Sequence, residues 1–142
     1  PASASGNPPT RRSEVLMAVT SIQNDRMPPA LGPYSQAVSA RGELVFVSGQ
    51  PGIDPESGSA PREFEQQGRM AFENLSRVLT AAGLSLSDVA KTTIYLADPA
   101  HFGSLNSLFG EYFPANPPTR AAPIVQLPKG LLISIEAVAV RS

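Results

Sequence analysis

The 142-residue sequence contains no cysteine and no tryptophan, and its single histidine is His101. Without cysteine, the chain cannot form disulfides, thiolate nucleophiles or cysteine-based zinc sites. One histidine also excludes a histidine-cluster metal site, so we expect no metal. No apolar run approaches the roughly 20 residues that a membrane-spanning helix needs, so we expect no membrane partner.

Charge is also scarce, because charged residues make up 16 % of the chain and the formal net charge is −1. Acidic and basic residues are interspersed, whereas a nucleic-acid-binding protein usually carries a basic stripe, so we expect no nucleic-acid partner. No glycine-rich phosphate loop is present, and no serine has a histidine or lysine at a catalytic-motif spacing. The length predicts one domain with a core of its own.

The N-terminal residues differ in composition from the rest of the chain. Residues 1–16 are rich in Pro, Ser and Ala without a sustained hydrophobic period, which predicts a tail over 1–20 and one folded domain over 21–142. We expect a cytoplasmic protein. The pair Arg11 and Arg12 leaves the alternative that residues 1–16 are the remnant of a mitochondrial or plastid transit peptide.

Hydrophobic periodicity predicts an α/β (α+β) domain with the element order ββαβαββ. The predicted strands are 36–40, 43–48, 89–97, 120–127 and 131–141, and the predicted helices are 62–82 and 98–113. The first two strands meet at Arg41-Gly42, which is typical of a hairpin, and 49–61 is predicted to be a loop. Strands separated by helices require crossovers, so we expect a two-layer sandwich with a mixed sheet and two helices on one face.

The last predicted strand is apolar on both faces, since its alternate positions are Leu, Ile, Ile, Ala, Ala and Leu, Ser, Glu, Val, Val. Strand 43–48 is two-sided as well. A strand of this kind is buried on both faces, but two helices cover only one face of a sheet. We expect a neighbouring copy of the chain to cover the other face. The alternative is a sheet that curls into its own barrel.

Glu136 is the only charged residue in 131–140, and a buried carboxylate needs a partner or a proton. Arg120, which follows the stiff segment 117–119 and begins the preceding predicted strand, is the candidate partner. Its guanidinium fork also suits a planar carboxylate ligand. The pair therefore predicts either a substrate site or a structural ion pair between strands or subunits.

Three further residues could line a cleft. Tyr34 could direct a phenol into it, although such a tyrosine is more often a half-buried packing residue. Ser48 and Gly49 end a buried strand and suit a rim where the backbone approaches a ligand, or simply a strand end. We expect His101 to be exposed and without a role. These groups suit the addition of water to an already reactive substrate.

Short motifs in register resemble the Rid (YjgF-type) family over residues 22–141. They are 28–37 (PPALGPYSQA), 46–50 (FVSGQ), 91–96 (KTTIYL), Asn106 within 105–113, 118–120 (PTR), and 127–128 (LP) followed by 135–139 (IEAVA). Each motif is weak alone, but together they identify the family.

The resemblance implies a chorismate-mutase-like fold and a homotrimer with clefts between subunits. It also implies the activity of a 2-iminobutanoate/2-iminopropanoate deaminase, which hydrolyses 2-aminoacrylate and related enamines or imines to 2-keto acids and ammonia without a cofactor. Arg120 would then bind the substrate carboxylate, and Glu136 would activate water and shuttle protons. The other positions that match the family's cleft are Tyr34, Ser48, Gly49 and Asn106.

Two positions depart from the family pattern. Many members carry a second Glu where this chain has Ser134, and Cys or another small polar residue where it has Ala122; both changes would alter substrate choice. Three alternatives stay open: a larger or aromatic enamine substrate, an RNA-cleaving or translation-inhibiting role, and a non-catalytic small-ligand sensor that uses the same cleft.

Overall fold

The computed structural model describes residues 18–142, so most of the predicted tail lies outside the described residues. The strands are β1 (Val19–Ile22), β2 (Ala37–Ala40), β3 (Glu43–Pro51), β4 (Val89–Leu96), β5 (Thr119–Ala121) and β6 (Ile133–Arg141). The helices are α2 (Phe64–Ala81) and α3 (Phe102–Tyr112), with short 3-10 turns η1 (Leu86–Asp88), η2 (Pro99–His101) and η3 (Pro128–Gly130). Strand β1 was not predicted, and it includes two residues assigned to the tail.

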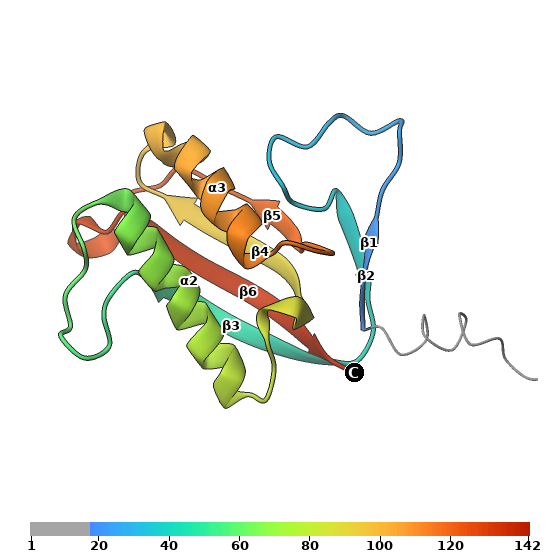
Figure 1. The fold of residues 1–142 in the computed structure, drawn as a ribbon, viewed down its shortest axis with the longest axis horizontal. Helices are drawn as coiled ribbons and strands as arrows, with labels where there is room; N and C mark the ends of the chain where they lie inside the picture. Colours follow the sequence, from blue (N-terminus) through green and yellow to red (C-terminus); the bar gives the residue numbers. More distant parts are fainter. Residues whose placement is uncertain (1–17) are drawn as a thin grey trace, which may run out of the picture.

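The main sheet has four strands in the order β3-β6-β4-β5. Strand β6 is antiparallel to both of its neighbours, whereas β4 and β5 are parallel and are joined by the crossover through α3. Helices α2 and α3 lie on the same face of this sheet (Figure 1). The predicted mixed sheet with two helices on one face is therefore confirmed.

The predicted hairpin at Arg41-Gly42 is wrong. Strand β2 pairs with β1 in a separate two-stranded sheet, and β3 pairs with β6. The β1–β2 pair is attached next to β5, at the edge of the main sheet opposite β3. There the Ser35 N–H donates to the Pro118 carbonyl at 3.1 Å, and the Asn116 side chain donates to the Val19 carbonyl at 2.9 Å. These long-range bonds connect the β1–β2 pair and the segment before β2 to the segment that leads into β5.

Two strand lengths also differ from the prediction. Strand β3 continues through the segment predicted to begin a loop, and β5 is only three residues long, followed by an isolated bridge between Leu96 and Ile124. Pro123 interrupts the predicted strand, since proline has no N–H to donate to a ladder.

The core lies between the helices and the sheet. Phe72, Leu75 and Leu79 of α2 are fully buried, as is Ile135 of β6. Phe72 stacks on Tyr112 of α3 with ring centroids 4.8 Å apart. The spacing of these apolar positions along α2 follows the helical period, which is why the sequence predicted this helix.

The opposite face of the sheet, called here the open face, carries apolar side chains without a cover in the chain itself. Leu44 and Phe46 of β3 are 54 % and 72 % exposed. The outer strands β3 and β5 do not pair with each other, so the main sheet does not close into a barrel within residues 18–142. None of the described helices is long and apolar enough to cross a membrane.

The first prediction concerns the core. Phe72→Ala should lower the free energy of unfolding by about 3–5 kcal/mol, since it leaves a cavity under α2. Val78→Ala, on the exposed side of the same helix, should change it by about 0.5 kcal/mol or less. Urea unfolding followed by circular dichroism measures both, and equal effects would contradict the assigned core face.

Candidate functional site

Arg120 lies in β5 and points to the helix side of the sheet. Its guanidinium carbon is 4.7 Å from the ring centroid of Tyr34 and 5.2 Å from those of Phe102 and Phe109. Aromatic faces attract a cation and stabilise it in a partly desolvated place. The sequence had indicated Tyr34, but the two phenylalanines of α3 were not recognised as neighbours of the arginine.

A chain of hydrogen bonds holds the guanidinium. Arg120 Nη1 donates to Asn106 Oδ1 at 2.8 Å, and Asn106 Nδ2 donates to the Leu31 carbonyl at 3.1 Å. The Leu31 N–H in turn donates to the Tyr34 hydroxyl oxygen at 3.1 Å. Asn106 therefore connects α3, β5 and the loop before β2, which gives it a structural reason to lie beside Arg120.

The charge of Arg120 has no anionic partner in the described part of the chain. No carboxylate of residues 18–142 lies within ion-pair distance of it. Burial lowers the pKa of Arg120 from its ordinary value, while the nearby Tyr34 opposes this effect. A half-buried guanidinium without a carboxylate partner is suited to bind a carboxylate ligand.

Gly32 allows the loop to lie directly against this group. A Cβ atom at this position would be 2.4 Å from Asn106 Oδ1 and 2.8 Å from Arg120 Nη2. Real Cβ atoms do not approach other atoms so closely, so a larger residue here would displace the Asn106 or Arg120 side chain. The loop thus forms one wall of the Arg120 site.

Glu136 belongs to a different group of residues, on the open face. Its neighbours along β6, Ile135 and Ala137, are buried under the helices, so the Glu136 side chain points the other way. The Tyr95 hydroxyl donates to Glu136 Oε1 at 2.6 Å. This hydrogen bond supplies the partner that a carboxylate in an apolar strand requires.

The predicted contact between Arg120 and Glu136 is therefore wrong within one chain. Arg120 is in register with Thr92, which faces the helices, whereas Glu136 is in register with Thr93, the next residue along β4. Successive residues of a strand point to opposite faces. Arg120 and Glu136, which the sequence suggested as a pair, therefore lie on opposite sides of the sheet.

A β-bulge brings Ser48 and Gly49 next to Glu136. Val47 pairs with Ala137 and Gln50 pairs with Ile135, so two residues of β3 face the single residue Glu136. Such bulges redirect side chains at functional edges. The adjacent hollow of about 360 Å³ is lined by Phe46, Val47, Lys91, Thr93, Glu136, Ala137 and Val138.

One copy of the chain thus divides the predicted site into two groups. The helix side carries Arg120, Asn106 and Tyr34, and the open face carries Glu136 with Ser48 and Gly49. Tyr95 was missed, although the alternation in 91–96 places it on the same face as Thr93. Among residues 18–142, no three His, Asp or Glu side chains are grouped as a metal site would require.

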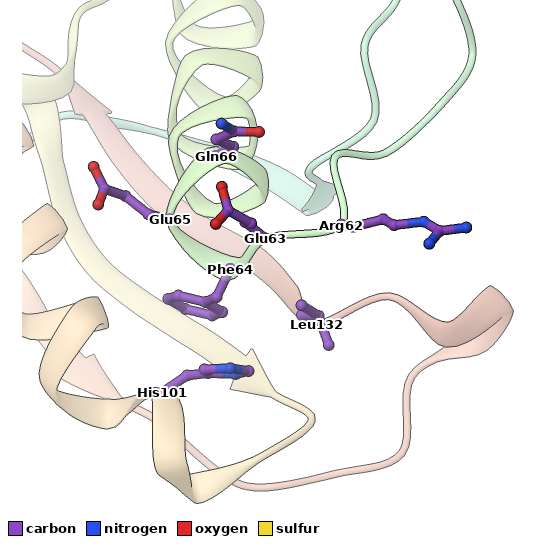
Figure 2. Close-up of a pocket in the computed structure, with 7 residues that line it drawn as sticks. All are labelled: Arg62, Glu63, Phe64, Glu65, Gln66, His101 and Leu132. Atoms are coloured by element: carbon purple, nitrogen blue, oxygen red, sulfur yellow. The ribbon is translucent and has the colours of Figure 1, made fainter.

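His101 is half-buried, so the prediction that it is exposed is wrong. Its ring stacks on Phe64 with centroids 4.3 Å apart and an interplanar angle of 16°. Figure 2 shows this stack beside a separate cavity of about 460 Å³, which Arg62, Glu63 and Leu132 also line. None of the residues that line it belongs to the predicted site.

Comparison with known proteins identifies the family. Residues 24–141 match the family model described as Endoribonuclease L-PSP, which covers the YjgF, RutC and Rid proteins, so the chain belongs to this family. It is 41 % identical over 122 residues to the mouse protein named 2-iminobutanoate/2-iminopropanoate deaminase, covering 84 % of this chain and 90 % of that protein. It is 38 % identical over 125 residues to the Escherichia coli K12 protein named putative reactive intermediate deaminase TdcF, covering 85 % and 96 %.

Solved structures show the same fold. The crystal structure of E. coli TdcF with bound serine superposes with a TM-score of 0.68 at 38 % identity, covering 87 % of this chain and 99 % of that one. The Yersinia pestis Rid protein YyfB superposes with a TM-score of 0.78 at 25 % identity, covering 88 % and 100 %. Relatives with deaminase names support a deaminase role for this family member.

The second prediction tests the wall of the Arg120 site. Gly32→Ala should lower the free energy of unfolding by about 1–3 kcal/mol, because the added methyl group displaces Asn106 or Arg120. Gly103→Ala is the control, since a Cβ there meets nothing within 4 Å, and it should be neutral or stabilise helix α3 by up to about 1 kcal/mol. Thermal or urea unfolding compares the two; if Gly32→Ala is as stable as the control, the close packing is not required.

Proposed function

We propose that this protein hydrolyses 2-aminoacrylate and related enamines or imines to 2-keto acids and ammonia, as a 2-iminobutanoate/2-iminopropanoate deaminase. The observation that carries the proposal is the half-buried Arg120 guanidinium, which has aromatic walls and no carboxylate partner within residues 18–142. Relatives at about 40 % identity with this activity in their names give the substrate class.

The proposed hydrolysis requires only two groups of the protein, because the substrate is already reactive. The imine tautomer of 2-aminoacrylate has an electrophilic C=N carbon next to its carboxylate. Arg120 binds the carboxylate by parallel hydrogen bonds. Water adds to that carbon while Glu136 accepts a proton from the water, so the C–O bond forms and the C=N π electrons move to nitrogen. Glu136 returns this proton to nitrogen, which gives a neutral tetrahedral carbinolamine. Glu136 then transfers the proton of the new hydroxyl group to nitrogen as the C=O bond forms and the C–N bond breaks, and pyruvate and ammonia leave.

Both groups can act on one substrate only if two copies of the chain meet. Arg120 and Glu136 lie on opposite faces of the sheet, and a three-carbon substrate cannot extend around it. The helix-side group of one copy must therefore approach the open face of another. Contacts between two different surfaces close into rings, and we propose the homotrimer that the family resemblance implies, with Phe46 and Leu44 buried in the interface.

The third prediction tests the two catalytic assignments. A threonine/serine dehydratase generates 2-aminoacrylate or 2-aminocrotonate, and keto-acid release is followed with and without this protein. Arg120→Ala should lower kcat/KM about 100-fold through the loss of charge-assisted hydrogen bonds. Glu136→Gln should lower kcat about 100-fold or more by removing the base.

Arg62→Ala and Glu63→Gln serve as matched controls, because they change the same residue types beside the separate cavity. Both should keep wild-type rates. If folded, assembled wild-type protein gives no acceleration, the proposal fails. If Arg120→Ala retains the wild-type rate, the carboxylate clamp is wrong.

The fourth prediction concerns assembly. Light scattering after gel filtration should give about three times the 14.9 kDa mass of one chain. Phe46→Asp puts a charge on the open face and should reduce the mass to one chain and abolish turnover, because a buried charge without a partner is costly. Val78→Asp, on α2, should leave the assembly intact. A wild-type monomer that turns over substrate would contradict this part of the proposal.

The family description names an endoribonuclease, so RNA cleavage is a second candidate. The formal net charge of −1 provides little electrostatic attraction for RNA. Incubation with labelled single-stranded RNA decides between the two: cleavage that Glu136→Gln abolishes would favour the nuclease.

A further inference from the structure

We propose that Tyr95 is a positioning residue for Glu136, which fixes one carboxylate oxygen and leaves the other available to the attacking water. This inference rests on the proposed function and adds a residue to it. Tyr95 lies in β4 on the open face, in register with Ser134 and diagonal to Glu136. Diagonal neighbours on antiparallel strands are within reach of an aromatic side chain.

The hydrogen bond is short and specific. The Tyr95 hydroxyl donates to Glu136 Oε1 at 2.6 Å, and no other side chain of residues 18–142 donates to either oxygen of this carboxylate. Lys91 lines the same hollow, but its Nζ donates to Thr93 Oγ1 at 3.1 Å. The terminal torsion of a glutamate is broad, so without the phenol the carboxylate would rotate. Tyr95 therefore decides which oxygen faces the substrate side.

The neighbouring residues leave room for this arrangement. Ser134, the cross-strand partner of Tyr95, has a short side chain, and its Oγ lies 2.7 Å from the Cβ position of Gly49. A Cβ atom at position 49 would therefore require the Ser134 hydroxyl to move, so glycine keeps this part of the bulge open.

The phenol keeps its role as donor over the working pH range. The hydrogen bond to Glu136, followed by burial, raises the pKa of the Tyr95 phenol, so the hydroxyl remains a donor in neutral and alkaline solution. During turnover the phenol stays bound to Oε1, while Oε2 accepts the proton of the attacking water and later returns it to nitrogen.

The fifth prediction compares Tyr95→Phe with Tyr112→Phe. The control removes the same kind of bond at another place, since the Tyr112 hydroxyl donates to Glu73 Oε2 at 2.9 Å on the helix side. Tyr95→Phe should lower kcat about tenfold, the effect of losing one hydrogen bond to a charged group, and leave KM within about twofold. Tyr112→Phe should match the wild type in both quantities.

A second measurement does not depend on turnover. In a crystal structure of assembled Tyr95→Phe, the Glu136 carboxylate should turn away from its wild-type orientation, because no other side chain of residues 18–142 donates to it. If wild type is active and Tyr95→Phe keeps its kcat, the inference is overturned. If wild type is inactive, the proposed function fails and the structure of the variant decides alone: an altered carboxylate orientation supports the positioning role, and an unchanged one overturns it.

Discussion

The alternation of side chains along β4, β5 and β6 determines how this protein can work. It directs Arg120 toward the helices and Glu136 toward the open face, two strands away. The same alternation leaves Phe46 and Leu44 exposed opposite the core. An enzyme that needs both charged groups must therefore be completed by another copy, and the apolar open face supplies the driving force for that contact. In the proposed function, catalysis and assembly both depend on one geometric property of the sheet.

Each half of the site is held in place by groups that take no part in the reaction. On the helix side, three aromatic rings and Asn106 fix the Arg120 guanidinium. On the open face, Tyr95 fixes Glu136. In the proposed mechanism, the helix side recognises the carboxylate, which every amino-acid enamine or imine has, and the open face carries the proton chemistry. Ser134, the cross-strand partner of Tyr95, lies beside the second half.

The hydrophobic pattern of the sequence correctly predicted the features that depend only on residues close together in the chain. The apolar spacing in α2, the crossover before β5 and the two-sided strand β6 all followed from residues close together in the sequence. Strand pairing is non-local, which is why the β2–β3 hairpin and an Arg120–Glu136 contact within one chain were predicted wrongly: each had to be inferred from adjacency along the chain. The bulge at Ser48-Gly49 and the role of Tyr95 depend on the register of strands distant in sequence. Most candidate site residues followed from the sequence pattern itself, whereas the family motifs added Asn106 and the expected roles.

Complementation between two inactive variants tests directly whether the site is shared by two copies. Arg120→Ala and Glu136→Gln are dissociated, mixed in equal amounts and reassembled, and keto-acid release is measured against each variant reassembled alone. If Arg120 and Glu136 act from different copies, random mixing restores about a quarter of the sites and therefore about a quarter of the wild-type rate. If the mixture, shown by mass to contain both variants in one assembly, is no more active than its components, both residues act within one chain and the account is contradicted.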